Sequence, residues 1–195
     1  AYDAVIITTK ALEETRVADE VLEDYLQQAV VSRAVRTLKK FEVPQGDTNG
    51  PTWIADFVVV DEAARFKNLW GPDLNLKYMG TPSASRRALH MHLRGFATRR
   101  NNTHGAGVVL LSATPAKNSP VELYNLGDII DPNLWERAGI FHADQFADRF
   151  IETATIPTLK TDLDVTVCPA AVGFKNMSEL RTLMCRFAEF KVVKD

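Results

Sequence analysis

Residues 58–68 read VVVDEAARFKN, and this segment decides the fold that the sequence predicts. The three valines continue a run that begins at Ala55, which is typical of a strand buried on both faces of a parallel sheet. Two neighbouring carboxylates, Asp61 and Glu62, follow at the point where that strand should end. Because adjacent residues of a strand point in opposite directions, these two side chains can perform different tasks. The simpler alternative is that Asp61 caps a short helix and that both carboxylates are solvated.

Apolar runs and helical periodicity alternate along the rest of the chain. Residues 2–8 and 108–111 are short β-branched runs that predict two further buried strands. Helices are predicted, from the spacing of apolar residues, at residues 18–40, 83–100, 121–130, 143–151 and 176–190. Residues 153–172 are predicted to be extended. Strands separated by helices favour an α/β fold with a parallel sheet flanked by helices, whose chemistry gathers beyond the carboxyl ends of the strands.

The third predicted strand ends in small hydroxyl residues, Ser112 and Thr114, on either side of Ala113. Hydroxyl groups both donate and accept hydrogen bonds, so these side chains can link a catalytic site to its neighbours. Further along, Ser119 and Glu122 have the spacing of a capping box at the start of the next helix. The capping box explains Ser119 but leaves the Ser-Ala-Thr triplet without a structural reason.

Together, the two segments resemble motifs II and III of the superfamily 2 helicases, specifically of the Swi/Snf-like DNA translocases. In that family a DEAH-type sequence followed by R-x-K-N precedes a strand that ends in T/S-G/A-T-P. The matching residues are Asp61, Glu62, Ala63, Arg65, Lys67, Asn68, Ser112, Ala113, Thr114, Pro115, Asn118, Glu122 and Leu123. Residues 2–9 are similar to motif Ib, and residues 173–184 look like the large helicase proteins of phages and plasmids.

The resemblance implies a DNA-dependent ATPase that couples ATP hydrolysis to movement on double-stranded DNA. Asp61 would hold the Mg²⁺ of Mg–ATP through its water shell, and Glu62 would activate the attacking water. Other roles are implied for a second set of residues: coupling for Ser112, Ala113 and Thr114, and contacts to the nucleic-acid backbone for Thr8 and Thr9. Lys67 and Asn68 match the family without an assigned role.

The resemblance also implies a domain organisation. Residues 1–130 would form part of a first RecA-like domain of the P-loop NTPase type, and residues 131–195 an extension toward a second one. None of the glycines fits a Walker A loop, so the phosphate loop is expected upstream and this segment alone is expected to be inactive. Ala64 stands where the family has a coupling histidine. This departure favours the alternative of a degenerate helicase domain that binds DNA or a protein without hydrolysing ATP; an unrelated α/β phosphohydrolase with Asp61 as metal ligand is a further alternative.

The formal net charge of −2 conceals a basic segment in the middle of the chain. Residues 63–118 hold nine basic residues and one acidic residue. Arg86, His90 and Arg94 share one face of a predicted helix, which suits contacts to nucleic-acid phosphates. The alternative is a solvated helix surface that pairs with the acidic residues between positions 13 and 24.

Composition excludes several classes of protein. With 46% hydrophobic and 25% charged residues, the chain is neither a disordered tail nor a disulfide-rich miniprotein. Cys168 and Cys185 are predicted to be reduced core residues, and the histidines lack metal-ligand spacing. No apolar run approaches the ~20 residues of a membrane span, and no signal segment leads the chain, which predicts a cytoplasmic protein without a membrane partner. The resemblance to the helicase proteins of phages and plasmids implies a bacterial or phage origin. The oligomeric state is left open by the sequence.

Overall fold

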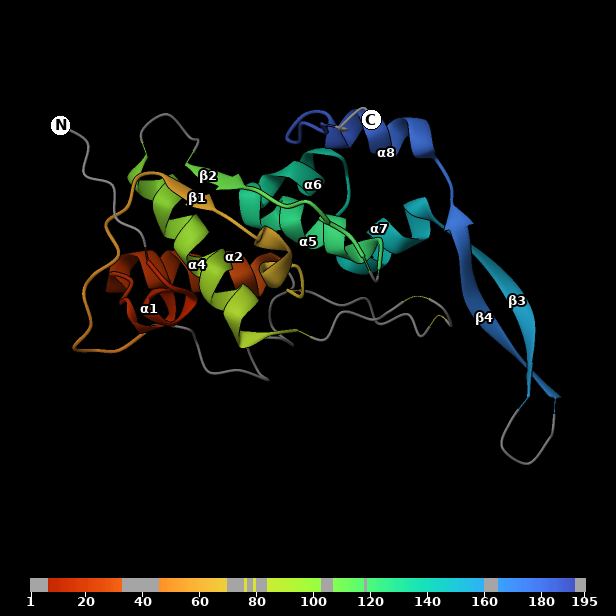
Figure 1. The fold of residues 1–195 in the computed structure, drawn as a ribbon, viewed down its shortest axis with the longest axis horizontal. Coiled ribbons are helices and arrows are strands. Elements are labelled where there is room, and N and C mark those ends of the chain that lie inside the picture. The colour runs from red at the N-terminus through yellow and green to blue at the C-terminus, as the bar shows by residue number, and fades with distance from the viewer. Residues whose placement is uncertain are drawn as a thin grey trace.

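The computed structural model describes residues 7–32, 46–69, 76, 79, 84–102, 107–117, 119–159 and 165–191. Its elements are, in chain order, α1 (Thr9–Glu14), α2 (Asp19–Ser32), β1 (Val58–Val60), the 3₁₀ helix η1 (Ala63–Phe66), α4 (Arg86–Asn101), β2 (Val108–Leu110), α5 (Val121–Ile130), α6 (Asn133–Arg137), α7 (Ala143–Phe150), β3 (Ile151–Leu159), β4 (Val165–Phe174) and α8 (Met177–Met184) (Figure 1). The fold is therefore mixed α/β. Across the described ranges, no helix is long and apolar enough to cross a membrane.

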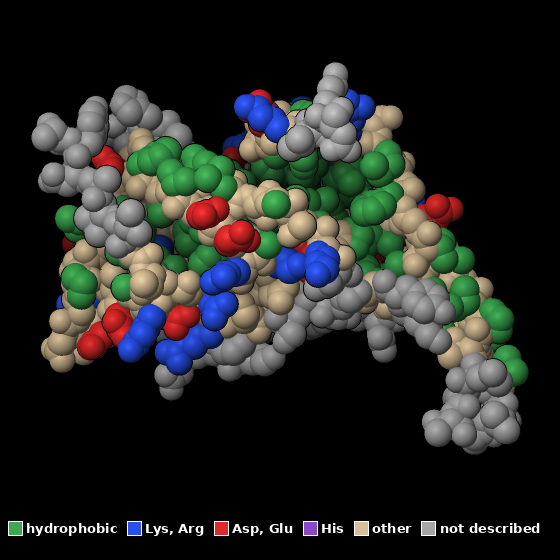
Figure 2. All heavy atoms as spheres, in the orientation of Figure 1, with side chains coloured by type: hydrophobic (Ala, Val, Ile, Leu, Met, Phe, Trp, Pro, Cys, Tyr) green, Lys and Arg blue, Asp and Glu red, His purple; other side chains and the backbone are tan. Residues whose placement is uncertain are grey.

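The strands β1 and β2 form a small parallel sheet, as the sequence predicts. Val58 pairs with Val108 and Val60 with Leu110. Val60 and Val108 belong to the core, whereas Val59 is 53% exposed on the opposite face. Figure 2 shows hydrophobic side chains at the surface over this sheet. The prediction of burial on both faces is therefore wrong for the described part of the sheet, of which only one face is covered.

The first predicted strand differs from the structure. Residues 2–6 lie outside the described residues, and Ile7 belongs to no strand. Thr8 is the N-cap of α1, because its side chain accepts a hydrogen bond from the Ala11 N–H, and Thr9 is the first helical residue. A β-branched residue with a hydroxyl group can end a strand or begin a helix, and here it begins a helix.

Helix α4 is buried over most of its length. Ser85 begins it by accepting a hydrogen bond from the Ala88 N–H at 3.2 Å. Contacts with α1, α2, α5, β2 and η1 surround it. Polar side chains such as His90, His92 and Arg94 are buried together with the apolar ones. The helix predicted at residues 83–100 is therefore confirmed, but the face shared by Arg86, His90 and Arg94 is not an exposed basic surface.

An aromatic cluster holds α5, α6 and α7 together. Trp135 is fully buried, and its ring centroid lies 5.4 Å from that of Tyr124 and 5.2 Å from that of Phe146. Phe187, which follows α8, approaches the same ring at 6.0 Å. Gly127 of α5 permits this packing, since a Cβ atom there would lie only 2.9 Å from the Trp135 ring.

The strands β3 and β4 form an antiparallel hairpin that extends away from the rest of the structure (Figure 1). This confirms the predicted extended conformation. The hairpin exposes Val165 and Val167, which are 69% and 68% accessible. Helix α8 follows directly but ends at Met184, earlier than predicted.

Candidate functional site

The carboxyl ends of β1 and β2 lie side by side. The Leu111 N–H donates to the Val60 carbonyl at 2.8 Å, and the Ala63 N–H donates to the Leu111 carbonyl at 2.9 Å. These hydrogen bonds continue the ladder beyond the strands and place the Asp61–Glu62 turn next to Ser112. The structure thus brings together the two predicted strand-end segments.

Glu62 has a left-handed backbone conformation, with φ 51° and ψ 43°. For a residue other than glycine this conformation costs about 1–3 kcal/mol and tends to occur at functional sites. The Asp61 Oδ1 atom accepts a hydrogen bond from the Glu62 N–H at 2.9 Å, and both side chains are exposed. The structure assigns Glu62 as the N-cap of η1, without a side-chain capping bond, so the capping role proposed for Asp61 is not observed.

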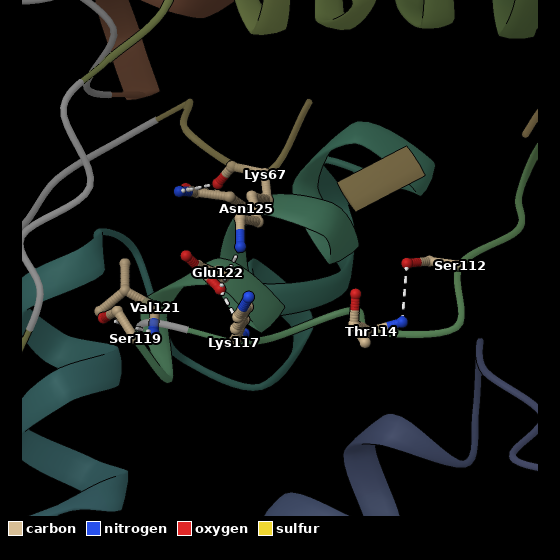
Figure 3. A network of polar contacts seen from close by, with 8 residues as sticks. All are labelled: Lys67, Ser112, Thr114, Lys117, Ser119, Val121, Glu122 and Asn125. Carbon is tan, nitrogen blue, oxygen red and sulfur yellow. Dashed lines mark hydrogen bonds and ion pairs between the residues drawn. The ribbon is translucent and has the colours of Figure 1, made fainter. Parts of the chain in front are cut away.

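Small polar side chains form the other half of this edge. The Ser112 Oγ atom accepts a hydrogen bond from the Thr114 N–H at 3.2 Å (Figure 3). Ser112 is half-buried, and Ala113 and Thr114 are exposed. The edge formed by these residues and the Asp61–Glu62 turn is called the strand-end site below.

A network of polar contacts connects the chain after η1 with α5 and with the loop after β2 (Figure 3). Lys67, directly after η1, forms an ion pair of 3.0 Å with the Glu122 Oε2 atom. The same oxygen accepts a hydrogen bond from the Lys117 N–H at 2.7 Å. Asn125 donates to the Lys67 carbonyl at 2.8 Å. In the sequence, Lys67 matches the R-x-K-N pattern, but nothing there indicates its partner Glu122 or a role for Asn125.

The predicted capping box is only half correct. The Ser119 Oγ atom accepts a hydrogen bond from the Val121 N–H at 3.3 Å, so this hydroxyl serves the start of α5. The structure assigns Pro120 as the N-cap. Glu122 is buried and its carboxylate binds Lys67 and the Lys117 N–H, so it has a tertiary role. Asn118 lies outside the described residues.

The residues predicted to contact DNA do not form one surface. Arg94 is fully buried, donates to the Thr15 carbonyl, and also donates to Thr15 Oγ1 at 3.3 Å. Burial lowers the pKa of Arg94 to about 10. Thr8 uses its hydroxyl as the cap of α1. Arg86, in contrast, is exposed at the start of α4. Arg94 is therefore wrong as a phosphate contact, whereas Arg86 remains accessible.

A buried polar cluster lies where α4 packs against α2 and α5. The Tyr25 hydroxyl lies 2.9 Å from His92 Nδ1, and Asp128 lies 3.3 Å from His92 Nε2. Burial and the nearby Asp128 raise the pKa of Tyr25. Arg99 donates to the Ile130 carbonyl at 3.0 Å and so binds the end of α5. These contacts join α2, α4 and α5, which is a structural role.

Replacing His90 by leucine is expected to reduce the acid sensitivity of the fold. His90 is buried without a hydrogen-bond partner, and burial lowers its pKa from 6.5 to about 4, with Arg94 and Arg86 adding to the effect. The unfolded chain then binds more protons between these values, so stability falls as pH drops from 6.5 toward 4. Between pH 6.5 and 4, we expect the free energy of unfolding of His90→Leu to fall by roughly 1–3 kcal/mol less than that of the wild type, measured by urea unfolding. The accessible His142 provides the control, and an unchanged pH slope in His90→Leu would contradict the prediction.

An open apolar groove runs between α5 and α8. Its volume is about 840 Å³, and its lining includes Leu123, Met177, Met184 and Phe190. Figure 2 shows the corresponding hydrophobic recess. The few polar groups along it, such as Arg181, do not form a site for nucleotide phosphates. The groove is lined mainly by apolar side chains, and none of its lining residues belongs to the strand-end site.

Both cysteines are free, as predicted. Cys168 is half-buried on β4, but Cys185 is exposed, so the prediction that both lie in the core is wrong for Cys185. Among the described residues, no group of His, Cys, Asp and Glu side chains could by itself hold a metal ion.

The chain is similar to Defense against restriction protein B of Escherichia phage P1, with 31% identity over 144 residues. The matched region is 72% of this chain but only 6% of that protein, so the chain spans a small part of its relative's length. No family model matches the chain, and no solved structure matches it.

These comparisons contradict the assignment to the superfamily 2 helicases of the Swi/Snf-like branch. The relative carries a name that does not indicate a helicase, and no helicase family model matches. The two motif-like segments are present and adjacent, but they do not establish that family. What the comparisons establish is similarity to a phage protein of defence against restriction.

Proposed function

We propose that the strand-end site hydrolyses ATP and that the protein uses this reaction to move on DNA. The observation that carries the proposal is the position of Asp61 and Glu62. They follow a parallel strand and lie exposed beside Ser112, at the carboxyl edge where α/β sheets place their chemistry. We further propose that β1 and β2 belong to a RecA-like sheet.

Asp61 fits the requirements of a Mg²⁺ ligand in such a site. Mg²⁺ is usually bound by one or two carboxylates together with substrate phosphates and water, rather than by a cage of protein ligands. Asp61 is exposed, and its Oδ1 atom accepts a hydrogen bond from the Glu62 N–H. The ion would neutralise charge on the phosphates, while Glu62 accepts a proton from the attacking water or orients it.

DNA is the partner that we propose for this reaction, in its double-stranded form. The relative's name refers to defence against restriction, a process directed at DNA, and the phage origin of that relative suggests action in the host cytoplasm. On this chain, the exposed Arg86 is a candidate for a phosphate contact, and Thr8 and Thr9 lie at an exposed helix start.

Replacing Arg86 by alanine is expected to weaken DNA binding. Loss of one phosphate contact should reduce the salt slope of DNA affinity by about 1, which anisotropy titrations at several salt concentrations measure. Equal salt slopes for the wild type and Arg86→Ala would exclude Arg86 from the DNA interface.

Replacing Arg94 by methionine is expected to act on stability. The change removes charged hydrogen bonds to Thr15 and should cost about 1.5–3 kcal/mol of unfolding free energy.

The alternative function is binding of DNA or of a protein without ATP hydrolysis. Ala64 favours it, because an alanine side chain has no polar atom that could link the Asp61–Glu62 turn to the Ser112–Thr114 segment.

The proposal is tested by measuring ATP turnover of the full-length protein with and without double-stranded DNA. Hydrolysis that rises on addition of DNA supports it. Hydrolysis that is indifferent to DNA contradicts the coupling, and DNA binding without any hydrolysis supports the alternative.

A further inference from the structure

We infer that Lys67 and Glu122 are positioning residues of the strand-end site. Their ion pair holds the Asp61–Glu62 turn in a fixed position relative to the Ser112–Thr114 segment. The inference rests on the proposed ATP hydrolysis. It adds the means by which the two halves of the strand-end site stay aligned.

The turn is fixed at both of its ends. On either side of Glu62, the Leu111 N–H donates to the Val60 carbonyl and the Ala63 N–H donates to the Leu111 carbonyl, which ties the chain to the end of β2. After η1, the Lys67 ammonium group binds Glu122 of α5. The left-handed Glu62 therefore lies between the two hydrogen bonds to Leu111, and η1 connects them to Lys67.

A single carboxylate oxygen connects the chain that follows η1 with the loop that follows β2. Glu122 Oε2 binds the Lys67 ammonium group at 3.0 Å and accepts the Lys117 N–H at 2.7 Å (Figure 3). Lys117 follows Thr114 closely in the chain, so the oxygen joins the end of η1 to the loop after β2. Asn125 adds a second link from α5 to the Lys67 carbonyl.

Burial makes this ion pair different from a surface pair. The side chains of Lys67 and Glu122 are 13% and 2% exposed. Removing one partner would leave the other charge buried without compensation, so the local structure would have to rearrange. Strained backbone persists only where its surroundings over-determine it. Without the pair, we expect Glu62 to leave its left-handed conformation and to lose its alignment with the nucleotide.

The experiment compares Lys67→Met and Glu122→Gln with the wild type in DNA-stimulated ATP turnover by the full-length protein. We expect kcat to fall roughly 10- to 100-fold, with KM for ATP changed much less, because the pair positions a reacting group and does not bind ATP. Lys67→Arg keeps the positive charge and is expected to fold and to recover most of kcat. Glu179→Gln is the matched control, since its ion pair with Arg149 lies between α7 and α8.

Glu62→Gln in the same assay separates the possible outcomes. If it abolishes turnover while folded Lys67→Met and Glu122→Gln keep the wild-type kcat, the inference is overturned and the proposed function stands. Undiminished turnover in Glu62→Gln overturns both. If Lys67→Met and Glu122→Gln fail to fold, Lys67→Arg decides: a folded variant with restored kcat supports the inference, and a folded variant with a kcat reduced at least 10-fold overturns it.

Discussion

ATP turnover is expected to fall by roughly 10²- to 10⁴-fold when Glu62 is replaced by glutamine. Glutamine has the size of glutamate but cannot accept a proton from water at neutral pH, so the change removes the general base alone. Glu62 is exposed, so the substitution removes no packing contact from the core. Phosphate release with saturating ATP and double-stranded DNA measures the effect.

Glu23→Gln is the matched control for this prediction. Glu23 is also an exposed glutamate, but it lies on α2, away from the strand ends. The control should keep wild-type turnover, and Glu62→Gln should bind DNA as the wild type does. Turnover of Glu62→Gln close to that of the wild type would remove Glu62 from the reaction and the strand-end site from the proposed mechanism.

The parallel pairing of β1 and β2 could be predicted because its signal is local. Continuous runs of β-branched residues, bounded by polar ones, indicate buried strands, and helices between them favour a parallel arrangement. Strand β1 begins three residues later than predicted but ends where predicted, β2 ends one residue early, and α5 has its predicted bounds. The adjacency of Asp61 and Ser112 follows from that pairing, so the strand-end site was accessible to sequence reasoning.

The surroundings of α4 could not be predicted in the same way. Periodicity places Arg86, His90 and Arg94 on one helix face but does not say what covers that face. In the structure α1 packs there, and Arg94 donates to Thr15, which lies 79 positions earlier. Only an intact tertiary fold identifies such a partner.

Glu122 shows the same limit at the site itself. Its spacing from Ser119 satisfies a local capping pattern, and a local pattern is all that a sequence offers. The tertiary partner is Lys67, 55 positions away, and it takes the carboxylate instead. The positioning pair therefore emerges from the structure, although both residues were visible in the sequence.

Replacing Trp135 by alanine is expected to lower the free energy of unfolding by about 3–5 kcal/mol. The indole ring is fully buried and stacks on Tyr124 at 5.4 Å between centroids. Its Nε1–H donates to the Tyr124 carbonyl at 2.9 Å, so truncation leaves a cavity and removes this buried hydrogen bond. Urea unfolding followed by circular dichroism measures the change.

Phe141→Ala is the control for the aromatic cluster, because this ring is 51% exposed and its truncation should change stability by about 0.5 kcal/mol or less. Gly127 explains why the cavity left by Trp135→Ala should persist. It lets α5 approach the ring so closely that a Cβ atom would lie 2.9 Å from it, and glycine has no side chain to refill the space. Equal losses for Trp135→Ala and Phe141→Ala would mean that the cluster around α5, α6 and α7 is not the centre of the core.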